Sequence, residues 1–185
     1  MTAFSRRDFL TTAGAGLLGA ALPAGLATRE AAATGISDGD DQMTFQVLRD
    51  GSEIGTHRLK FSQEGRRTLV DIDIDLEVGV GPLVLYRYVH RNREVWEDGR
   101  FMRFESRTDD DGETYAVTAE RKADDIVVDR RPAEDYRIDR PDVLPTSYWN
   151  EATVRQQVLL DTQKGRKMAV DVADRGWDQV EAAGR

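Results

Sequence analysis

The chain has 185 residues, a formal net charge of −8 at pH 7 and no cysteine. The lack of cysteine excludes disulfides, thiolate metal sites, iron–sulfur clusters and covalent c-type haem. The negative charge repels phosphate backbones and the basic residues form no stripe, so nucleic acid is not an expected partner.

An export signal is predicted over residues 1–27. A basic start leads into a short Gly- and Ala-rich apolar run that ends in small residues, an arrangement that resembles the twin-arginine signal of proteins exported in the folded state. Its defining residues are Arg6, Arg7, Phe9 and Leu10. We therefore expect recognition by the twin-arginine machinery and a periplasmic or other extracytoplasmic location. Cleavage after Ala27 or after Ala33 fits the sequence equally well.

The rest of the chain is predicted to form a flexible tail over residues 28–41 and one β-rich domain over residues 42–185. The apolar run of the signal is shorter than the roughly 20 residues that span a bilayer. No later stretch is longer or more apolar, so we expect no permanent membrane span after cleavage.

From Met43 onward the dominant hydrophobic period is two, which is typical of half-buried antiparallel strands. Strands are predicted at 43–49, 53–61, 68–78, 84–97, 101–108, 113–121 and 126–128, separated mainly by Gly- and Asp-containing turns. The connections are too short for crossover helices, which excludes a parallel α/β sheet. Along the third strand, acidic residues alternate with apolar ones. These are Asp71, Asp73, Asp75 and Glu77, and we interpret them as a solvated outer face; a calcium site is the alternative.

The pattern changes after residue 130. Residues 130–145 contain three prolines among charged side chains and predict an extended surface loop. One short helix is expected within 146–153, followed by strands at 155–160, 168–172 and 177–180. About nine antiparallel strands with one apolar face each predict an all-β fold, a single meander that forms a strongly curved sheet or a closed or open β-barrel.

The long strand at 84–97 mixes polar and aromatic side chains on the face that it presents to the interior. The candidate ligand-binding residues are Tyr86, Tyr88, His90, Asn92, Glu94 and Trp96, with Trp149 from a later segment. A sealed core rarely tolerates such polar groups, because each buried polar atom needs a partner. Two interpretations are open: these side chains satisfy one another, or they contact a ligand in a cavity.

Catalytic and metal sites have less support. The two histidines with one carboxylate, His57, His90 and Glu94, could form a metal site, although hydrogen-bonded wall residues are the simpler interpretation. No nucleophile-elbow sequence accompanies any serine, and no Gly-rich phosphate loop opens a helix. The sequence therefore favours a protein that is not an enzyme, and it identifies no cofactor.

Several short motifs together carry a resemblance. They are Phe45-x-Val47-x-x-Asp50-Gly51, His90-x-x-x-Glu94-x-Trp96-x-Asp98-Gly99, Ser106-x-Thr108-x-x-Asp111-Gly112, Pro145-Thr146-Ser147-Tyr148-Trp149-Asn150 and Leu160-Asp161-Thr162-Gln163-x-Gly165. The chain resembles an uncharacterised family of exported bacterial β-rich proteins. The resemblance implies a fold similar in outline to periplasmic half-barrels and lipocalin-like carriers. Because such proteins continue through further strands, it also implies an exposed edge near 177–180 or an incomplete sequence.

Two functional hypotheses follow. The first is a non-enzymatic carrier that holds a small, mostly apolar molecule against the aromatic side chains of the long strand, with its polar groups orienting the ligand. The second is an accessory subunit of an envelope complex that docks through an open sheet edge and the Tyr148-Trp149 loop.

Overall fold

The computed structural model describes residues 41–140 and 142–173. The predicted signal segment, most of the predicted tail and the predicted strand at 177–180 lie outside these residues. Within them the fold is all-β, as predicted. The described part contains no helix of the length and apolarity needed to cross a membrane.

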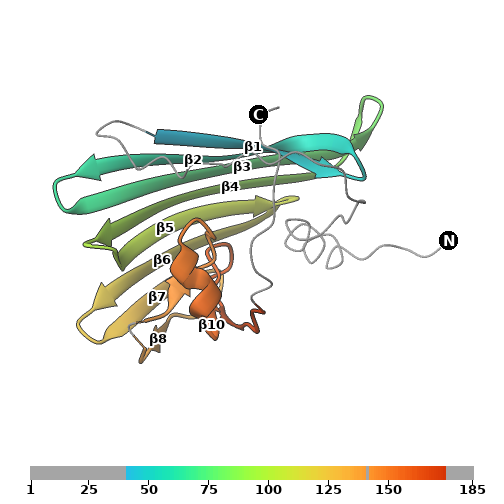
Figure 1. Cartoon of the computed structure of the whole chain (residues 1–185). Coiled ribbons are helices and arrows are strands. Elements are labelled where there is room, and N and C mark those ends of the chain that lie inside the picture. The colour runs from blue at the N-terminus through green and yellow to red at the C-terminus, as the bar shows by residue number, and fades with distance from the viewer. Residues whose placement is uncertain (1–40, 141, 174–185) are drawn as a thin grey trace. The chain divides into compact units, whose positions relative to one another are not determined.

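Eight strands form one antiparallel meander (Figure 1). In sheet order they are β1 (Asp41–Arg49), β2 (Ser52–Glu64), β3 (Arg67–Val80), β4 (Leu83–Glu97), β5 (Arg100–Asp110), β6 (Glu113–Lys122), β7 (Asp125–Arg131) and β8 (Tyr136–Ile138). Each strand pairs with its neighbour in sequence, and β1 and β8 do not pair with each other, so the described sheet is open.

Asp-Gly dipeptides close three of the hairpins. At Asp50-Gly51, Asp98-Gly99 and Asp111-Gly112 both residues have positive φ, between 49° and 91°. Two successive positive φ angles match the right-handed twist of the flanking strands. Only Gly, Asn and Asp adopt them readily, which is why these dipeptides fix both the turn position and the strand register.

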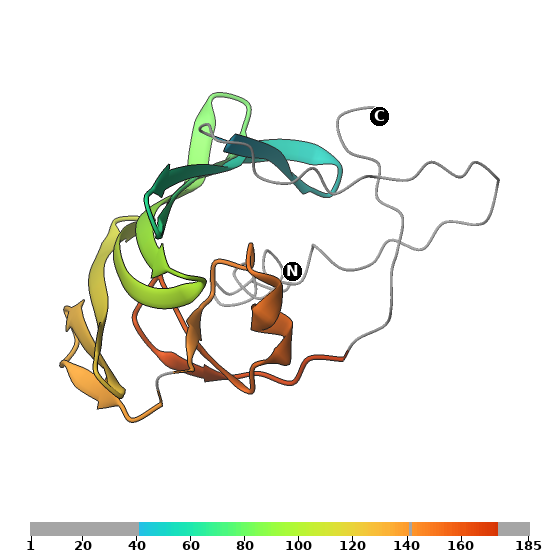
Figure 2. The same ribbon diagram turned by 60° about the vertical axis from the view of Figure 1, so that its left-hand side comes forward.

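A second, small sheet follows in the chain. It consists of β9 (Leu144–Pro145), β10 (Val158–Leu160) and β11 (Lys167–Ala169), with the 3-10 helix η1 (Glu151–Arg155) between β9 and β10. Asn150 caps η1 by accepting a hydrogen bond from the Ala152 N–H at 2.9 Å. The eight-stranded sheet curves around this segment, which lies on its concave side (Figure 2).

The structure corrects the prediction for residues 130–145, which contain β8 and β9 rather than only a surface loop. Val143 and Leu144 are buried in the core, and β9 pairs with β10 in parallel. The predicted helical turn is present but starts later than expected, at Glu151. The strand predicted at 155–160 is limited to β10.

The core fills the space between the concave face and the C-terminal segment. Its largest buried apolar side chains are Trp96, Phe101, Phe104, Ile126, Leu160, Val70, Val128 and Val143. They form one hydrophobic cluster together with residues of β2, β6 and β8. The two layers therefore depend on each other for burial, and neither has a separate core.

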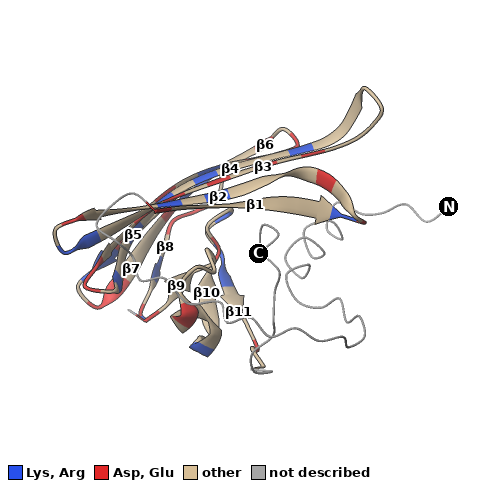
Figure 3. Ribbon diagram, turned by 45° about the horizontal axis from the view of Figure 1, so that its top comes forward, with Lys and Arg blue, Asp and Glu red and all other residues tan. Residues whose placement is uncertain are grey.

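Charged residues recur along the strands of the large sheet (Figure 3). The acidic residues of β3 alternate with its buried residues and lie on the convex face, as predicted, and three of them pair with arginines of β4. Asp71 contacts Arg93 at 2.6 Å, and Arg91 contacts both Asp73 at 3.2 Å and Asp75 at 2.7 Å. This cross-strand ladder accounts for three of the carboxylates without a calcium ion, and the described residues contain no group of three or more acidic or histidine side chains placed to hold a metal.

Candidate ligand-binding site

The interior face of β4 carries the predicted site residues. From Tyr86 to Trp96 every second side chain points to the concave side, and those from Tyr88 onward are buried. Neighbouring strands add further residues in register: His57 of β2 lies opposite Ile74 of β3, and Ile74 lies opposite His90. The concave face divides into two regions around these side chains, one centred on Glu94 and one on His90.

The Glu94 carboxylate accepts several hydrogen bonds, although the neighbouring Asn92 Oδ1 is buried without a partner among the described residues. Glu94 is fully buried, and its Oε2 accepts from the indole Nε1 of Trp96 at 2.9 Å and of Trp149 at 3.0 Å. Its Oε1 accepts from Asn92 Nδ2 at 3.0 Å, and Ser147 provides a further side-chain hydrogen bond. Burial raises the pKa of Glu94, while these four donors act in the opposite direction.

Trp149 reaches this region from the loop between β9 and η1. Its ring packs edge-on against Phe61, with centroids 5.4 Å apart, and against Trp96 at 5.0 Å. Tyr148, which precedes it with a positive φ of 60°, is 62% exposed. The backbone turn at Tyr148 thus places the two adjacent aromatics on opposite sides, Trp149 in the core and Tyr148 in solvent.

The His90 region has a different character. His90 is buried, and its Nδ1 lies 2.9 Å from Thr108 Oγ1. The Thr108 hydroxyl in turn donates to the Gln163 carbonyl at 3.2 Å, so Thr108 can only accept from His90. His90 therefore carries its proton on Nδ1. Burial lowers the pKa of His90 to about 4, which keeps the ring neutral at pH 7.

A turn over residues 161–165 holds the far side of this region. The Asp161 carboxylate accepts from the backbone N–H groups of Gln163 at 2.8 Å and Lys164 at 3.3 Å. This exposes the carbonyls of Thr162 and Gln163 to β5, where the hydroxyls of Ser106 and Thr108 donate to them. The Leu160-Asp161-Thr162-Gln163-x-Gly165 motif noted in the sequence thus holds the C-terminal segment against the large sheet.

Two buried polar atoms in the His90 region have no hydrogen-bond partner among the described residues. They are the hydroxyl of Tyr88 and Nε2 of His57. Apolar and acidic groups both lie near Tyr88: in the sheet it lies opposite Leu76 of β3 and Asp110 of β5, and Asp161 also acts on it electrostatically. The Phe45 ring lies 6.0 Å from His57. Burial raises the pKa of Tyr88 and lowers that of His57, so both groups are neutral at pH 7.

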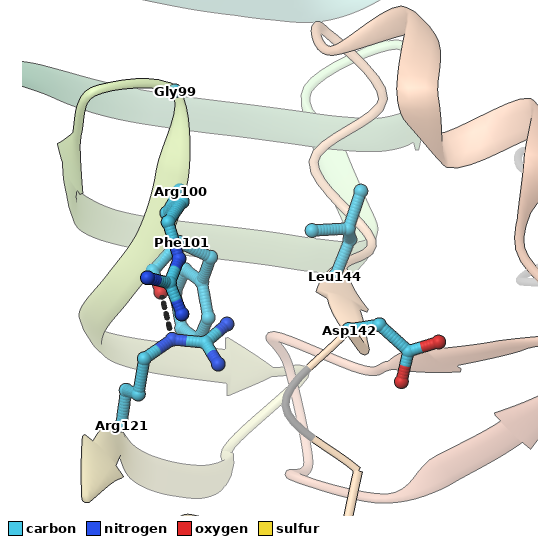
Figure 4. A pocket seen from close by; sticks show the side chains of 6 residues that line it. All are labelled: Gly99, Arg100, Phe101, Arg121, Asp142 and Leu144. Atoms are coloured by element: carbon cyan, nitrogen blue, oxygen red, sulfur yellow. Dashed lines mark hydrogen bonds between the residues drawn. The ribbon is translucent and has the colours of Figure 1, made fainter. Parts of the chain in front are cut away.

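Two pockets can be placed relative to these regions. One of about 140 Å³ borders Tyr88, and Ile54, Gly55, Asp75, Leu76, Glu77, Arg87 and Val89 complete its wall. A larger pocket of about 290 Å³ lies between β5, β6 and the segment before β9, and none of its lining residues belongs to the Glu94 or His90 region (Figure 4). Its lining residues are Gly99, Arg100, Phe101, Arg121, Asp142 and Leu144. Arg121 donates to the Phe101 carbonyl at 2.7 Å and Asp142 is paired with Arg140, so both have partners inside the protein.

The structure brings the predicted ligand-binding residues onto one face but uses them differently. Asn92, Trp96 and Trp149 each donate a hydrogen bond to Glu94. Tyr86 instead donates to Asp110 at 2.8 Å. Tyr88 and His90 lie in the other region. The set His57, His90 and Glu94 is not gathered into a metal site in the part of the chain that the structure describes.

Residues 45–185 match the family described as a domain of unknown function, DUF6134. The chain belongs to this family. The match confirms that the resemblance stated from the sequence motifs is to an uncharacterised family. Comparison of the DUF6134 chain with curated proteins and with solved structures gives no match. Twin-arginine export and similarity to lipocalin-like carriers remain predictions from the sequence.

Proposed function

We propose that this DUF6134 domain binds and carries a small, mostly apolar, neutral molecule that bears a hydroxyl or carbonyl oxygen. The observation that carries the proposal is the pair of buried, unpartnered polar atoms in the His90 region, Tyr88 Oη and His57 Nε2. Leaving a buried polar group without a partner costs about 1–3 kcal/mol. A ligand oxygen placed beside these two atoms would supply the missing hydrogen bond.

The electrostatics of the region favour a neutral ligand. Desolvation is the largest cause of the lowered pKa of both His57 and His90, so the region disfavours a positive charge. Tyr88 keeps its proton, because burial raises its pKa, and its hydroxyl can donate to a ligand oxygen. The contact set proposed here is His57, Tyr88 and His90 with Phe45 and Leu76.

The proposal shifts the centre of the site relative to the prediction from sequence. The donors around Glu94 are already bonded to its carboxylate, which favours a structural role for that half of the face. Asn92 Oδ1 is the one group there that lacks a partner among the described residues. Phe45 and Leu76 were not predicted as ligand contacts, although both lie at apolar positions of strands whose period-two pattern pointed them inward. In the same proposal, the signal over residues 1–27 directs the carrier to an extracytoplasmic compartment.

A matched pair of tyrosine variants tests the proposal, with Nile red as the neutral lipophilic probe. Tyr88→Phe removes a hydroxyl that has no described partner, so we expect unchanged or slightly higher stability and about tenfold weaker probe binding. Tyr136→Phe removes a hydroxyl that donates to the Gly165 carbonyl at 2.9 Å. We expect it to lower the free energy of unfolding by about 1 kcal/mol and to leave probe binding unchanged.

Native mass spectrometry of protein recovered from the extracytoplasmic fraction of its host provides the second measurement. We expect a non-covalent small molecule that is lost in the Tyr88→Phe variant. If no such molecule is found and Tyr88→Phe binds Nile red as tightly as the unmodified protein, the carrier function is ruled out.

The accessory-subunit hypothesis has one observation in its favour. The β3–β4 hairpin ends in exposed apolar side chains: Val80 is 69% exposed, Leu83 61% and Leu85 56%. An exposed apolar patch is typical of a protein-binding surface. The same recovery experiment separates the two functions, because an accessory subunit would be isolated with a protein partner and without a small molecule.

A further inference from the structure

The outer edge of β1 differs from the other edge of the sheet. β8, at the opposite edge, is three residues long and carries Arg137 at its centre. β1 is nine residues long, and among the described strands it pairs only with β2. Natural proteins usually protect such edges with charged residues, proline or short length, because a free edge offers hydrogen-bonding groups to another strand. The centre of β1 has none of these protections.

The sequence of β1 complements itself when read in both directions. It reads DQMTFQVLR, with no charge between Asp41 and Arg49. If two copies pair antiparallel with Phe45 opposite Phe45, each Asp41 lies opposite an Arg49, and each Met43 lies opposite a Val47. All five residues lie on the same face of the strand, because they are spaced by two.

The two largest apolar side chains of this face are exposed. Met43 is 44% exposed and Phe45 47% exposed. The register shift between β1 and β2 falls between Val47 and Leu48, so Met43 to Val47 lie in the regular part of the pairing. Opposite-charge and aromatic or apolar cross-strand pairs each stabilise an antiparallel pair by about 0.2–1 kcal/mol.

We propose that β1 is a self-association edge, through which two copies of this chain pair antiparallel about a two-fold axis at Phe45. The two eight-stranded sheets then continue into each other, and the exposed Met43 and Phe45 side chains cover those of the second copy. The interface is isologous, since the same strand is used by both copies, and it closes at the dimer. Phe45 also belongs to the proposed ligand contact set, but Asp41, Met43, Val47 and Arg49 do not, so variants at these four positions test the pairing separately from ligand binding.

Cysteine cross-linking tests the register, because the chain has no cysteine of its own. In directly opposite residues the Cβ atoms are about 4.5–5.5 Å apart, close to the spacing that a disulfide requires. Phe45→Cys is therefore expected to form a disulfide-linked dimer under mild oxidation. Met43→Cys alone and Val47→Cys alone are expected to remain unlinked, whereas a mixture of the two is expected to cross-link.

Charge reversal tests the end pairs. Asp41→Arg and Arg49→Asp each place like charges opposite each other at both ends of the paired strands. We expect each to weaken the dimer about tenfold in sedimentation equilibrium, and the double variant to restore it. Circular dichroism of each variant checks that the fold is intact.

Three outcomes would overturn the proposal. The first is a monomer at all concentrations, as expected if the edge accepts an extended peptide of another protein or another segment of this chain. The second is equal cross-linking at residues 43, 45 and 47. The third is a double charge variant that is no better than the single variants.

Discussion

At the scale of single residues, Glu94 is a buried carboxylate held by hydrogen bonds from four side chains. Its Oε2 atom accepts hydrogen bonds from the indole N–H of the buried Trp96 and from that of the partly buried Trp149. On its other side lies Asn92, whose Oδ1 is buried without a partner among the described residues. Exchange of the Asn92 amide nitrogen and oxygen would let Asn92 accept a hydrogen bond from a protonated residue at position 94.

This geometry gives opposite expectations for two substitutions at Glu94. Glu94→Gln keeps an oxygen for both indoles, and its amide can donate to Asn92 Oδ1 after the exchange. We expect its free energy of unfolding to stay within about 1 kcal/mol of the unmodified protein. Glu94→Leu leaves both indole N–H groups unpaired and is expected to cost about 2–5 kcal/mol. Urea unfolding followed by tryptophan fluorescence measures both, and an equal loss in the two variants would contradict this account.

Single residues also show what the sequence could and could not predict. The shared face of Asn92, Glu94 and Trp96 follows directly from a period of two, and so does the inward position of His57. Trp149 as a partner of Glu94 could not be predicted, because the two residues are 55 positions apart and the contact depends on how the second layer packs. Arg91 and Arg93 gave a signal that was missed, since they alternate along β4 as the aspartates do along β3.

At the scale of secondary structure elements, β2 and β3 approach each other closely at Gly55, next to a bulge in β2 where its pairing with β1 shifts register. Gly55 has φ of +151°, and a Cβ atom built on it would lie 1.9 Å from the Asp75 carbonyl oxygen. This is far inside any allowed contact, and the atom it meets is backbone, which cannot rotate away. Gly55 therefore allows the bulge in β2 to form without moving β3.

Two glycine-to-alanine variants measure how much this close approach of β2 and β3 limits substitution at Gly55. Gly55→Ala is expected to lower the free energy of unfolding by more than about 3 kcal/mol, because two strands must separate. Gly51→Ala, at φ of +79° with no atom within 4 Å of the added Cβ, is expected to cost only about 1 kcal/mol of backbone strain. Thermal unfolding of the two variants checks this. Similar melting temperatures would mean that the two strands can adjust at Gly55.

The elements themselves were predictable in proportion to their length. β1 to β7 each contain several periods of alternation and are bounded by turn residues, so the sequence predicts them within a few residues. β8 and β9 are three and two residues long and carry no periodic signal. Their pairing depends on residues far along the chain, which is why residues 130–145 were interpreted as a loop.

At the scale of the whole molecule, one continuous core joins the curved sheet to the C-terminal segment. Leu159 and Leu160 of β10 lie in the same cluster as Val70 of β3 and Phe104 of β5. Because neither layer buries its apolar face alone, we expect cooperative unfolding in a single transition. The protonation of any one buried group therefore changes the free energy of this single unfolding transition.

The histidines determine the sign of this pH dependence. Burial lowers the folded-state pKa of His90 to about 4, below its ordinary value of 6.5. Between these pH values the unfolded chain therefore binds more protons than the folded protein does. The contribution of His90 to the free energy of unfolding is complete above pH 6.5 and is lost as pH falls towards about 4. The shift corresponds to about 3 kcal/mol. The lowered pKa of His57 acts in the same direction, and the raised pKa of Glu94 opposes it.

We expect His90→Gln to have a flatter stability profile over this pH range than the unmodified protein, even if its stability at pH 7 is lower. Urea unfolding at a series of pH values measures both profiles. His57→Gln is the matched comparison, with a smaller change expected because this side chain is only partly buried. An unaltered slope in His90→Gln would show that His90 is not the group that titrates.

The docking of the turn at residues 161–165 has a consequence for biosynthesis. Ser106 of β5 bonds to the Thr162 carbonyl, 56 residues later in the chain. A nascent polypeptide can form the hairpins of the meander as they emerge, but its inner surface stays uncovered until Thr162 has left the ribosome. During that interval the half-built domain presents a broad apolar surface to chaperones, so translation speed between β5 and β10 bears directly on the yield of native protein.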